Sequence, residues 1–323
     1  MDTAALVGPA RDLNESAGAS GLVGGSDAAR TSLEERRKLA ESLDDPLNRY
    51  YRYPVARALL RIAGGLPLRP DHITYLHTTL GVAGAAMIAW GGRPSLVAAF
   101  FLLEARMILD CYDGVLARAK KLSSPRGRTL DELGDAVAYA AICVGMNVHV
   151  YRTHPDWPAE LITAFGAILL LAGGMSGHAY DFYKRRLGSA LKEGRDAIAE
   201  ELEQKQELVR TGGAKWITRF GIWFDRWQVR LYEPRYKGGD AVGTVVSRAN
   251  NTGVRFLVKL IGFISSDNVL GMISIGVLLD RVVEVELIAL AYLVVMFTLA
   301  RVTIWRVLGG RAERAGDAGG GRA

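Results

Sequence analysis

The sequence predicts an all-α, polytopic membrane protein with six transmembrane helices and an N-terminal juxtamembrane amphipathic helix. Hydrophobic residues make up 50% of the 323 residues. Several apolar windows come close to the roughly 20 residues that a helix needs to cross a bilayer. Basic residues gather in alternate connections between those windows, which is the pattern of cytosolic loops in helical membrane proteins.

The chain before the first span divides into a tail and a surface helix. Residues 1–45 begin with a stretch rich in Ala, Gly and Ser, so we expect a disordered tail without a cleavable signal peptide. A short soluble helix follows, in which Thr31 and Glu34 have capping-box spacing. Next, Arg57 and Arg61 share one helix face among Tyr, Leu and Ile. This pattern predicts a helix on the membrane surface, with its arginines toward anionic headgroups.

Six apolar windows follow, and each is typical of a membrane-spanning helix. The fifth window is short by itself, and we expect that span to extend upstream through Asn268 and its neighbours. The predicted spans are residues 73–90, 96–113, 130–150, 161–180, 269–279 and 285–305.

The distribution of basic residues orients these spans. Lys and Arg are most frequent in residues 46–72, 118–128 and 183–260, and in the tail after Arg306. The positive-inside rule places those segments in the cytosol. With six spans, both termini then face the cytosol as well. We therefore expect an integral membrane protein whose polar site faces the cytosol.

Residues 184–253 form a predicted insertion between spans four and five. Its first half is charged and has helical periodicity, and its second half interleaves Trp, Phe and Arg. Basic and aromatic residues alternate in this way in nucleic-acid-binding proteins too. Beside a membrane domain we favour a helix at the lipid interface, with no nucleic-acid partner. The other predicted parts are residues 1–45 (tail and soluble helix), 46–183 (surface helix and spans one to four) and 254–323 (spans five and six and a basic tail).

Four aspartates stand where two predicted spans meet the cytosol. Asp110 and Asp113 share one face at the end of the second span, and Asp131 and Asp135 share one face at the start of the third. Carboxylates gathered in one place repel one another and lose hydration, so we expect divalent cations between them. Oxygen ligands without His or Cys suit Mg²⁺ or Mn²⁺, with Ca²⁺ left open. Two such ions serve phosphoryl transfer in many enzymes.

An ion-pair cluster is the alternative explanation for these aspartates. The neighbouring basic residues that could neutralise them are Arg118, Lys120, Lys121, Arg126 and Arg128. Ion pairs explain scattered charges at a helix end, but they do not explain two carboxylate pairs at helix-face spacing. The two cysteines, Cys111 and Cys143, lie in apolar surroundings, and we interpret them as reduced packing residues.

The segment that holds the four aspartates resembles a family signature. Eight fixed positions over residues 110–135 are similar to the pattern D-x2-D-G-x2-A-R-x8-G-x3-D-x3-D of the CDP-alcohol phosphotransferases. The wider resemblance covers about residues 46–183 and 254–306. It includes a P-x-x-I-T segment at Pro70, where the family more often has Asn in place of Asp71. Because of that departure, a nucleotide contact at this position is not carried over from the family to Asp71.

The resemblance implies a two-metal centre with Mg²⁺ or Mn²⁺. Asp110, Asp113 and Asp131 would bind metal, and Asp135 would complete the shell of the second ion. Asp135 would also be the catalytic base that takes the proton from the acceptor alcohol. A base beside two metal ions is what an in-line displacement needs.

The resemblance also implies a binding site for the CDP group. Gly114 and Ala117 would lie against the cytidine, Arg118 would meet phosphate, and Gly127 would give room at the start of span three. A hydroxyl would attack the phosphoryl group next to the leaving CMP. The other expected partners are membrane lipids, and a homodimer is left open.

Several alternatives remain at this point. The donor is either CDP-diacylglycerol, which we favour, or a CDP-amino alcohol such as the choline or ethanolamine derivative. A divalent-metal transporter that uses the aspartates as an ion site is a hypothesis from another class. Lys184, Arg185 and Arg186 are either ligands of an acceptor phosphate or positive-inside anchors.

Overall fold

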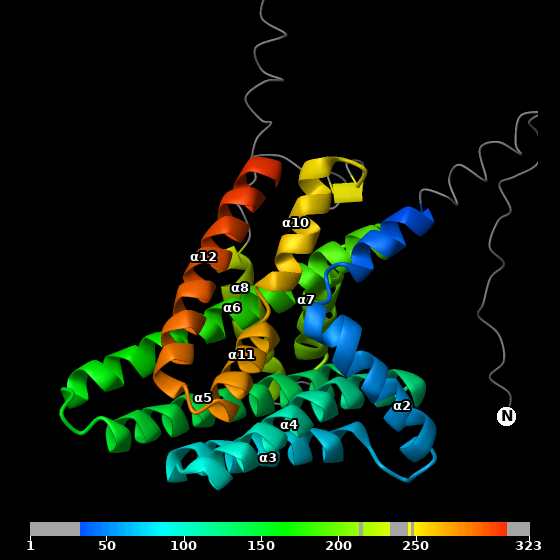
Figure 1. Ribbon diagram of the computed structural model, residues 1–323. Coiled ribbons are helices and arrows are strands. Elements are labelled where there is room, and N and C mark those ends of the chain that lie inside the picture. Colours follow the sequence, from blue (N-terminus) through cyan, green and yellow to red (C-terminus); the bar gives the residue numbers. More distant parts are fainter. Residues whose placement is uncertain (1–32, 213–215, 233–244, 247–248, 309–323) are drawn as a thin grey trace, which may run out of the picture.

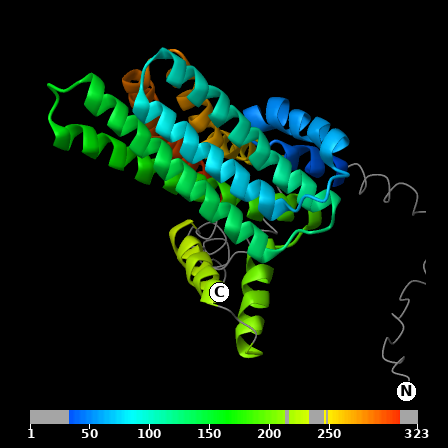
Figure 2. The ribbon, with the colours of Figure 1, turned by 90° about the horizontal axis from the view of Figure 1, so that it is seen from below.

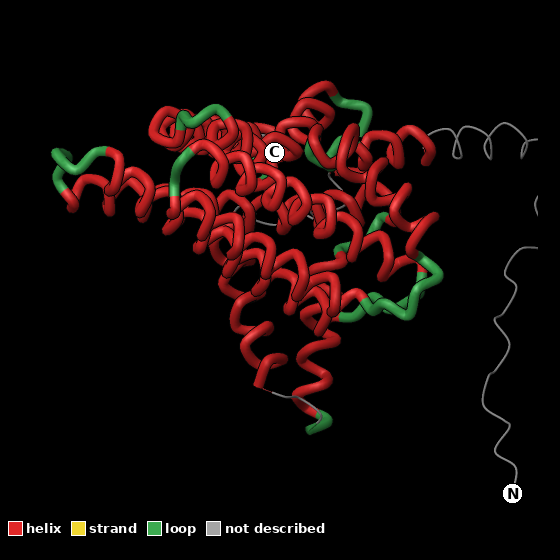
Figure 3. Tube along the Cα trace, turned by 60° about the horizontal axis from the view of Figure 1, so that its bottom comes forward, coloured by secondary structure: helices red, strands yellow, loops and turns green. Residues whose placement is uncertain are grey.

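The structure, a computed structural model, describes residues 33–212, 216–232, 245–246 and 249–308. Within that part of the chain every regular element is a helix and no strand occurs (Figure 3), as the sequence predicts. The N-terminal tail, Thr31 and the basic C-terminal tail lie outside the described residues. Residues 33–41 form the predicted short helix.

The described elements that follow are all helical. In chain order they are η1 (Asn48–Arg52), α2 (Tyr53–Ala63), α3 (Pro70–Trp90), α4 (Arg93–Ala119), α5 (Pro125–Thr153), α6 (Ala159–Glu193), α7 (Ala197–Arg210), α8 (Trp216–Tyr232), α10 (Thr252–Phe263), α11 (Ser266–Leu278) and α12 (Val282–Leu308).

Two layers of helices make up the core. α3 packs along both α4 and α5, and α6 runs back along α5 (Figure 2). α11 packs on α4, and α12 packs on α6, α10 and α11 on the other side (Figure 1). The turn between α3 and α4 is tight because Gly91 and Gly92 adopt φ values of 74° and 81°, which glycine reaches without steric cost.

The span prediction is borne out in its coarser form. α3, α5, α6 and α12 are each long and apolar enough to cross a bilayer. α10 and α11 make a fifth candidate if the pair counts as one span, because they meet at a 43° bend. The predicted second span is a helix, α4, but its composition does not mark it as a candidate because it carries several charged residues, Glu104 and Arg106 among them.

α11 begins at Ser266 and therefore includes Asn268 and its neighbours, by which we expected the fifth span to be extended upstream. α10 supplies further apolar residues upstream of α11. Arg255 and Lys259 interrupt the apolar run of α10, and both side chains are exposed. Polar groups at the bend bind one another: the Asn268 side chain donates to the Gly262 carbonyl (3.0 Å), so the break leaves that carbonyl satisfied.

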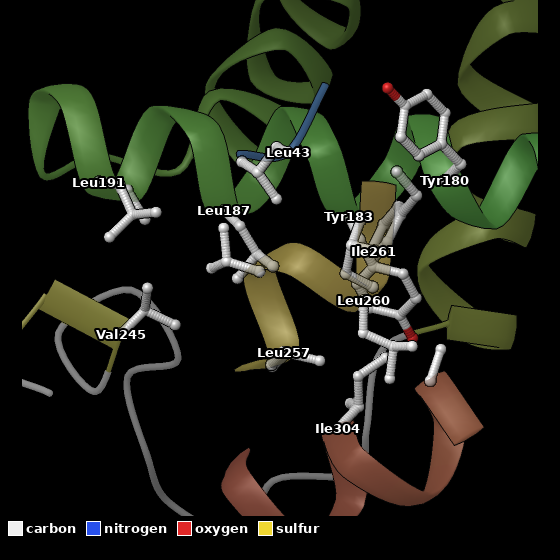
Figure 4. Close-up of a cluster of buried hydrophobic side chains, with 14 of the residues drawn as sticks. Leu43, Tyr180, Tyr183, Leu187, Leu191, Val245, Leu257, Leu260, Ile261 and Ile304 are labelled. Atoms are coloured by element: carbon white, nitrogen blue, oxygen red, sulfur yellow. The ribbon is translucent and has the colours of Figure 1, made fainter. Parts of the chain in front are cut away.

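The predicted insertion is attached to the core by a cluster of buried side chains (Figure 4). α6 continues past the predicted end of span four and brings Leu187 and Leu191 against residues of α10 and α12. The end of α8 is buried there too, with Tyr232 at 0% exposure. Tyr183 Oη donates to the Tyr232 carbonyl (2.6 Å), and Tyr232 Oη donates to the Met175 carbonyl (3.0 Å). The insertion is therefore packed on the helical core.

Gly145 lies at the closest approach of α5 to α3. A Cβ at this position would overlap the carbonyl oxygen of Ala85, which belongs to the backbone. Gly145→Ala is therefore expected to destabilise the protein by about 1–3 kcal/mol, the usual cost of overpacking. A thermal unfolding experiment in detergent measures this as a lower midpoint.

Gly174→Ala is the matched control for this substitution. Gly174 lies on α6, and a Cβ there meets nothing within 4 Å. Because Ala favours a helix more than Gly does, we expect this variant to unfold at or above the wild-type temperature. Equal destabilisation by the two substitutions would contradict the close approach of α5 to α3.

Candidate active site

The four aspartates of the motif lie together at one end of the α3–α4–α5 group. Asp110 and Asp113 belong to the last turns of α4, and Asp131 and Asp135 to the first turns of α5. α5 begins earlier than the predicted span because Ser124 caps it, its side chain accepting a hydrogen bond from the Gly127 amide (3.0 Å). The helix ends thus bring both carboxylate pairs to one place.

His77 of α3 lies among these carboxylates, with 0% exposure. Its Nε2 atom is 3.3 Å from Asp113 Oδ2, 3.3 Å from Asp131 Oδ1 and 3.9 Å from Asp110 Oδ1. Its Nδ1 atom is 4.0 Å from Asp135 Oδ1. Four possible ligand atoms lie within 4.8 Å of one another, one each from His77, Asp110, Asp131 and Asp135. A group of this size could hold a metal ion. The sequence predicts oxygen ligands alone, and His77 is not among the predicted site residues.

Two more side chains from outside the motif bind two of the aspartates, Asp113 and Asp135. Thr74 Oγ1 donates a hydrogen bond to Asp113 Oδ2 (2.9 Å). Arg106, one turn before Asp110 on α4, is buried at 2% exposure and donates from Nη2 to Asp135 Oδ1 (2.5 Å). Thr74 belongs to the P-x-x-I-T segment, so that segment contributes directly to the site.

Two cavities meet at the aspartates. The larger has a volume of about 280 Å³ and the smaller about 250 Å³. Asp113, Gly114, Arg118 and Asp131 line both of them. The aspartates therefore lie where a group bound in one cavity can reach a group bound in the other.

The smaller cavity contains all four residues predicted to bind the CDP group. Ala117 and Gly127 line this cavity together with the shared Gly114 and Arg118. A Cβ at Gly127 would come within 3.2 Å of Ser124 Oγ, so a side chain there would crowd the cavity. Asp71, where the sequence departs from the family pattern, lines the same cavity.

The larger cavity contains the remaining carboxylates of the motif. Asp110 and Asp135 line it, together with residues from α6 and from the start of α11. Its other ionisable residues include Glu132, Asp181 and Asp267. The cavity therefore carries many oxygen acceptors, which suit a hydroxyl-bearing molecule.

The three cations at the end of predicted span four all have carboxylate partners. Lys184 pairs with Asp44 (2.8 Å). Arg185 pairs with Glu201, and Arg186 pairs with Asp196 (2.9 Å). Lys184 alone of the three lines the larger cavity. These ion pairs favour a structural role for the three cations over the binding of an acceptor phosphate.

Glu201 of α7 links the predicted insertion to the start of α5. Its carboxylate pairs with Arg128 of α5, Arg185 of α6 and, at 3.1 Å, Lys205 of α7. Burial raises the pKa of Glu201, but these three cations outweigh that effect and hold the pKa below its ordinary value. The link is therefore complete at neutral pH and is lost as the pH falls through that lowered pKa.

Glu201→Gln is expected to loosen α7 from the core. Without the carboxylate, Arg128 and Arg185 face each other with no common partner, which disfavours the docked position. We expect amide hydrogen exchange in α7 to become about tenfold faster, equivalent to about 1.4 kcal/mol of local stability. Glu203→Gln, an exposed position on the same helix, is the control. Unchanged exchange in the Glu201 variant would refute the proposed link.

Comparison with known proteins adds two findings. Residues 68–185 match the family model described as CDP-alcohol phosphatidyltransferase. The chain is also 36% identical over 110 residues to a protein of Rubrobacter xylanophilus named bifunctional IPC transferase and DIPP synthase. That match covers 33% of this chain and 24% of the relative, so the chain spans about a quarter of the length of the curated relative it matches. The matched family region contains α3, α4, α5 and most of α6, and with them all four aspartates.

Proposed function

We propose that this chain is an enzyme that makes a phospholipid by group transfer within the membrane, because residues 68–185 match the family model described as CDP-alcohol phosphatidyltransferase. It transfers a substituted phosphoryl group from a CDP-linked donor, CDP-diacylglycerol, to the hydroxyl of an alcohol and releases CMP. The observation that carries this proposal is the meeting of two cavities at the four motif aspartates. The name of the relative, which includes a transferase, is in line with group transfer.

The residues at this meeting point fit a divalent metal centre. Among the described residues, Asp131 Oδ1 and both ring nitrogens of His77 are buried without a hydrogen-bond partner, although buried polar atoms are nearly always satisfied. Asp110, Asp113, Asp131 and Asp135 would hold two ions, Mg²⁺ or Mn²⁺. Bound there, such ions neutralise phosphate charge and stabilise the leaving group. Carboxylate oxygens are the ligands that both ions prefer.

The smaller cavity is the proposed donor site. Gly114, Ala117 and Gly127 have little or no side chain, so the cytidine can lie directly against the helix backbones. Arg118 offers two parallel N–H donors to a phosphate. Both cavities include Arg118, which suits a residue that binds the phosphate nearest the reacting bond.

The larger cavity is the proposed acceptor site, and Asp135 is the proposed base. Asp135 lines this cavity and does not line the smaller one. Its Oδ1 atom accepts from Arg106, which orients the carboxylate. The acceptor hydroxyl gives its proton to Asp135 as its oxygen attacks the phosphorus, and the bond from phosphorus to CMP breaks on the opposite side, in the smaller cavity.

The proposed membrane arrangement has six spans, with α4 as the second. Its charged residues face protein: Glu104 Oε1 accepts from Ser274 of α11 (2.8 Å) and Arg106 binds Asp135. A charged residue is tolerated within a span when it faces the helix bundle. α2 then lies on the membrane surface, and the site and both termini face the cytosol by the positive-inside rule.

Purified protein in lipid nanodiscs tests this function. We expect CMP release from CDP-diacylglycerol to require both an alcohol, drawn from a panel of polyols and phosphorylated polyols, and Mg²⁺ or Mn²⁺. Release only from CDP-choline with diacylglycerol as acceptor would reassign the donor to the amino-alcohol class. Divalent-ion flux into vesicles without CMP release from any donor would reject the enzyme and support a transporter.

A further inference from the structure

His77 is the one basic side chain of α3 that the aspartates surround. Its imidazole is completely buried, and each nitrogen faces at least one carboxylate oxygen at 3.3–4.0 Å. Within the described part of the chain, neither nitrogen makes a hydrogen bond. A buried imidazole with two unsatisfied nitrogens is costly, so an additional partner at this position would offset the cost.

We propose that His77 provides a nitrogen ligand to the divalent-ion site, and that this ligand shifts the ion preference from Mg²⁺ toward Mn²⁺. The inference rests on the proposed function, since it concerns the same ion site. Mg²⁺ binds mainly to oxygen, whereas imidazole suits transition metals, and affinities for nitrogen-containing sites rise from Mn²⁺ along the first row. A mixed site of carboxylates and one imidazole therefore discriminates against Mg²⁺ more strongly than carboxylates alone.

The spacing of the donor atoms supports direct ligation. Oxygen and nitrogen ligands at about 2.0–2.2 Å from one ion lie at most roughly 4.4 Å apart. The donor atoms of His77, Asp110, Asp131 and Asp135 already fall within 4.8 Å of one another. A small contraction of this group is enough to form a coordination shell that includes the imidazole.

A purely structural role for His77, as a hydrogen-bond donor to the aspartates, fits the structure less well. Nε2 lies within 3.3 Å of both Asp113 and Asp131, but no contact has hydrogen-bond geometry. Asp113 Oδ2 already accepts from Thr74. Asp113 and Asp135 are thus positioned by Thr74 and Arg106, and the imidazole is left available to an ion.

Electron paramagnetic resonance of the full chain with Mn²⁺ and no substrate tests the inference. The loss of the free Mn²⁺ signal measures how much ion the protein binds. Pulsed measurements on the bound ion detect a nitrogen nucleus that is directly coordinated. We expect wild-type protein to bind Mn²⁺ and to show this nitrogen coupling. His77→Asn should abolish the coupling and lower the ratio of Mn²⁺ to Mg²⁺ affinity by about tenfold.

His149→Asn is the matched control. His149 is also buried, at 6% exposure, but it lies against the Ile88 carbonyl (3.2 Å) at the far end of α3. This variant should keep the nitrogen coupling and the affinity ratio. Bound Mn²⁺ without nitrogen coupling in wild-type protein would overturn the role of His77 and leave the proposed carboxylate site intact. Coupling that persists in His77→Asn would overturn it as well. Absence of Mn²⁺ binding in wild-type protein would also overturn the role of His77, and the proposed function would then be judged separately, by Mg²⁺-dependent release of CMP.

Discussion

Asp135→Asn should lower kcat for CMP release by about 10²- to 10⁴-fold, which is the usual contribution of a general base. The amide keeps the shape of the side chain but does not take a proton from the acceptor hydroxyl. Affinity for CDP should stay close to that of wild-type protein, because Asp135 lines the larger cavity and the proposed nucleotide residues line the smaller one. A kinetic assay of CMP release, with calorimetric titration of CDP, measures both quantities.

Two comparisons make this result interpretable. Asp156→Asn alters an exposed aspartate in the loop between α5 and α6 and should leave kcat unchanged. Arg106→Met removes the guanidinium that binds Asp135, and we expect it to lower kcat without changing the affinity for CDP. Wild-type turnover by Asp135→Asn would refute the assignment of the base.

Asp113→Ala should remove activity and its dependence on divalent ions together. Asp113 lines both cavities, is 6% exposed and accepts a hydrogen bond from Thr74. If Asp113 is a metal ligand, as we propose, its loss affects donor and acceptor at once. We expect CMP release below about one-hundredth of the wild-type rate at any Mg²⁺ or Mn²⁺ concentration, since even the partners of metal ligands contribute 10- to 100-fold.

Thr74→Val is expected to have a weaker effect than Asp113→Ala at the same position of the site. It keeps the volume of the side chain but removes the hydroxyl that orients Asp113. We expect activity to be recovered at a concentration of divalent ion about 10- to 100-fold higher than wild-type protein needs. If Asp113→Ala still responded to added Mg²⁺, Asp113 would not be a metal ligand.

The positions of the four aspartates on helix faces could be predicted because that information is local. Steps of three and four residues place Asp110 with Asp113, and Asp131 with Asp135, on single helix faces. The structure has both pairs on helices, as expected. In the structure both helices pack along α3, so the meeting of the two carboxylate pairs depends on tertiary packing that the helix-face spacing does not give.

The side chains that contact the motif aspartates from other parts of the chain could not be predicted in the same way. His77 reaches the aspartates only because α3 packs along both α4 and α5, and nothing in the local sequence around His77 specifies that packing. One signal was available: His77 follows Thr74 by about one helical turn, so the two share a face. Arg106 was visible as a charged residue within an apolar window, but its contact with Asp135 depends on the same packing.

The ends of two helices, α6 and α10, differ from the predicted boundaries where charged residues lie on a helix that is otherwise buried. α6 continues through Lys184, Arg185 and Arg186 to Glu193, because ion pairs with Asp44, Glu201 and Asp196 accommodate those cations. α10 begins at Thr252, two residues before the predicted boundary between the insertion and the last two spans. Its arginine and lysine point outward while its other face is buried in the core. Hydropathy averages over a window and does not separate the two faces of such a helix.

The two cavities that meet at the aspartates have a consequence for the order of chemical events. If donor and acceptor occupy different cavities, as we propose, neither has to leave before the other arrives. Both are then present in one ternary complex, and a single displacement inverts the configuration at phosphorus. A covalent phosphoryl-enzyme would instead give ping-pong kinetics, with parallel double-reciprocal plots. Intersecting plots, and no CMP exchange into the donor without acceptor, are what this arrangement requires.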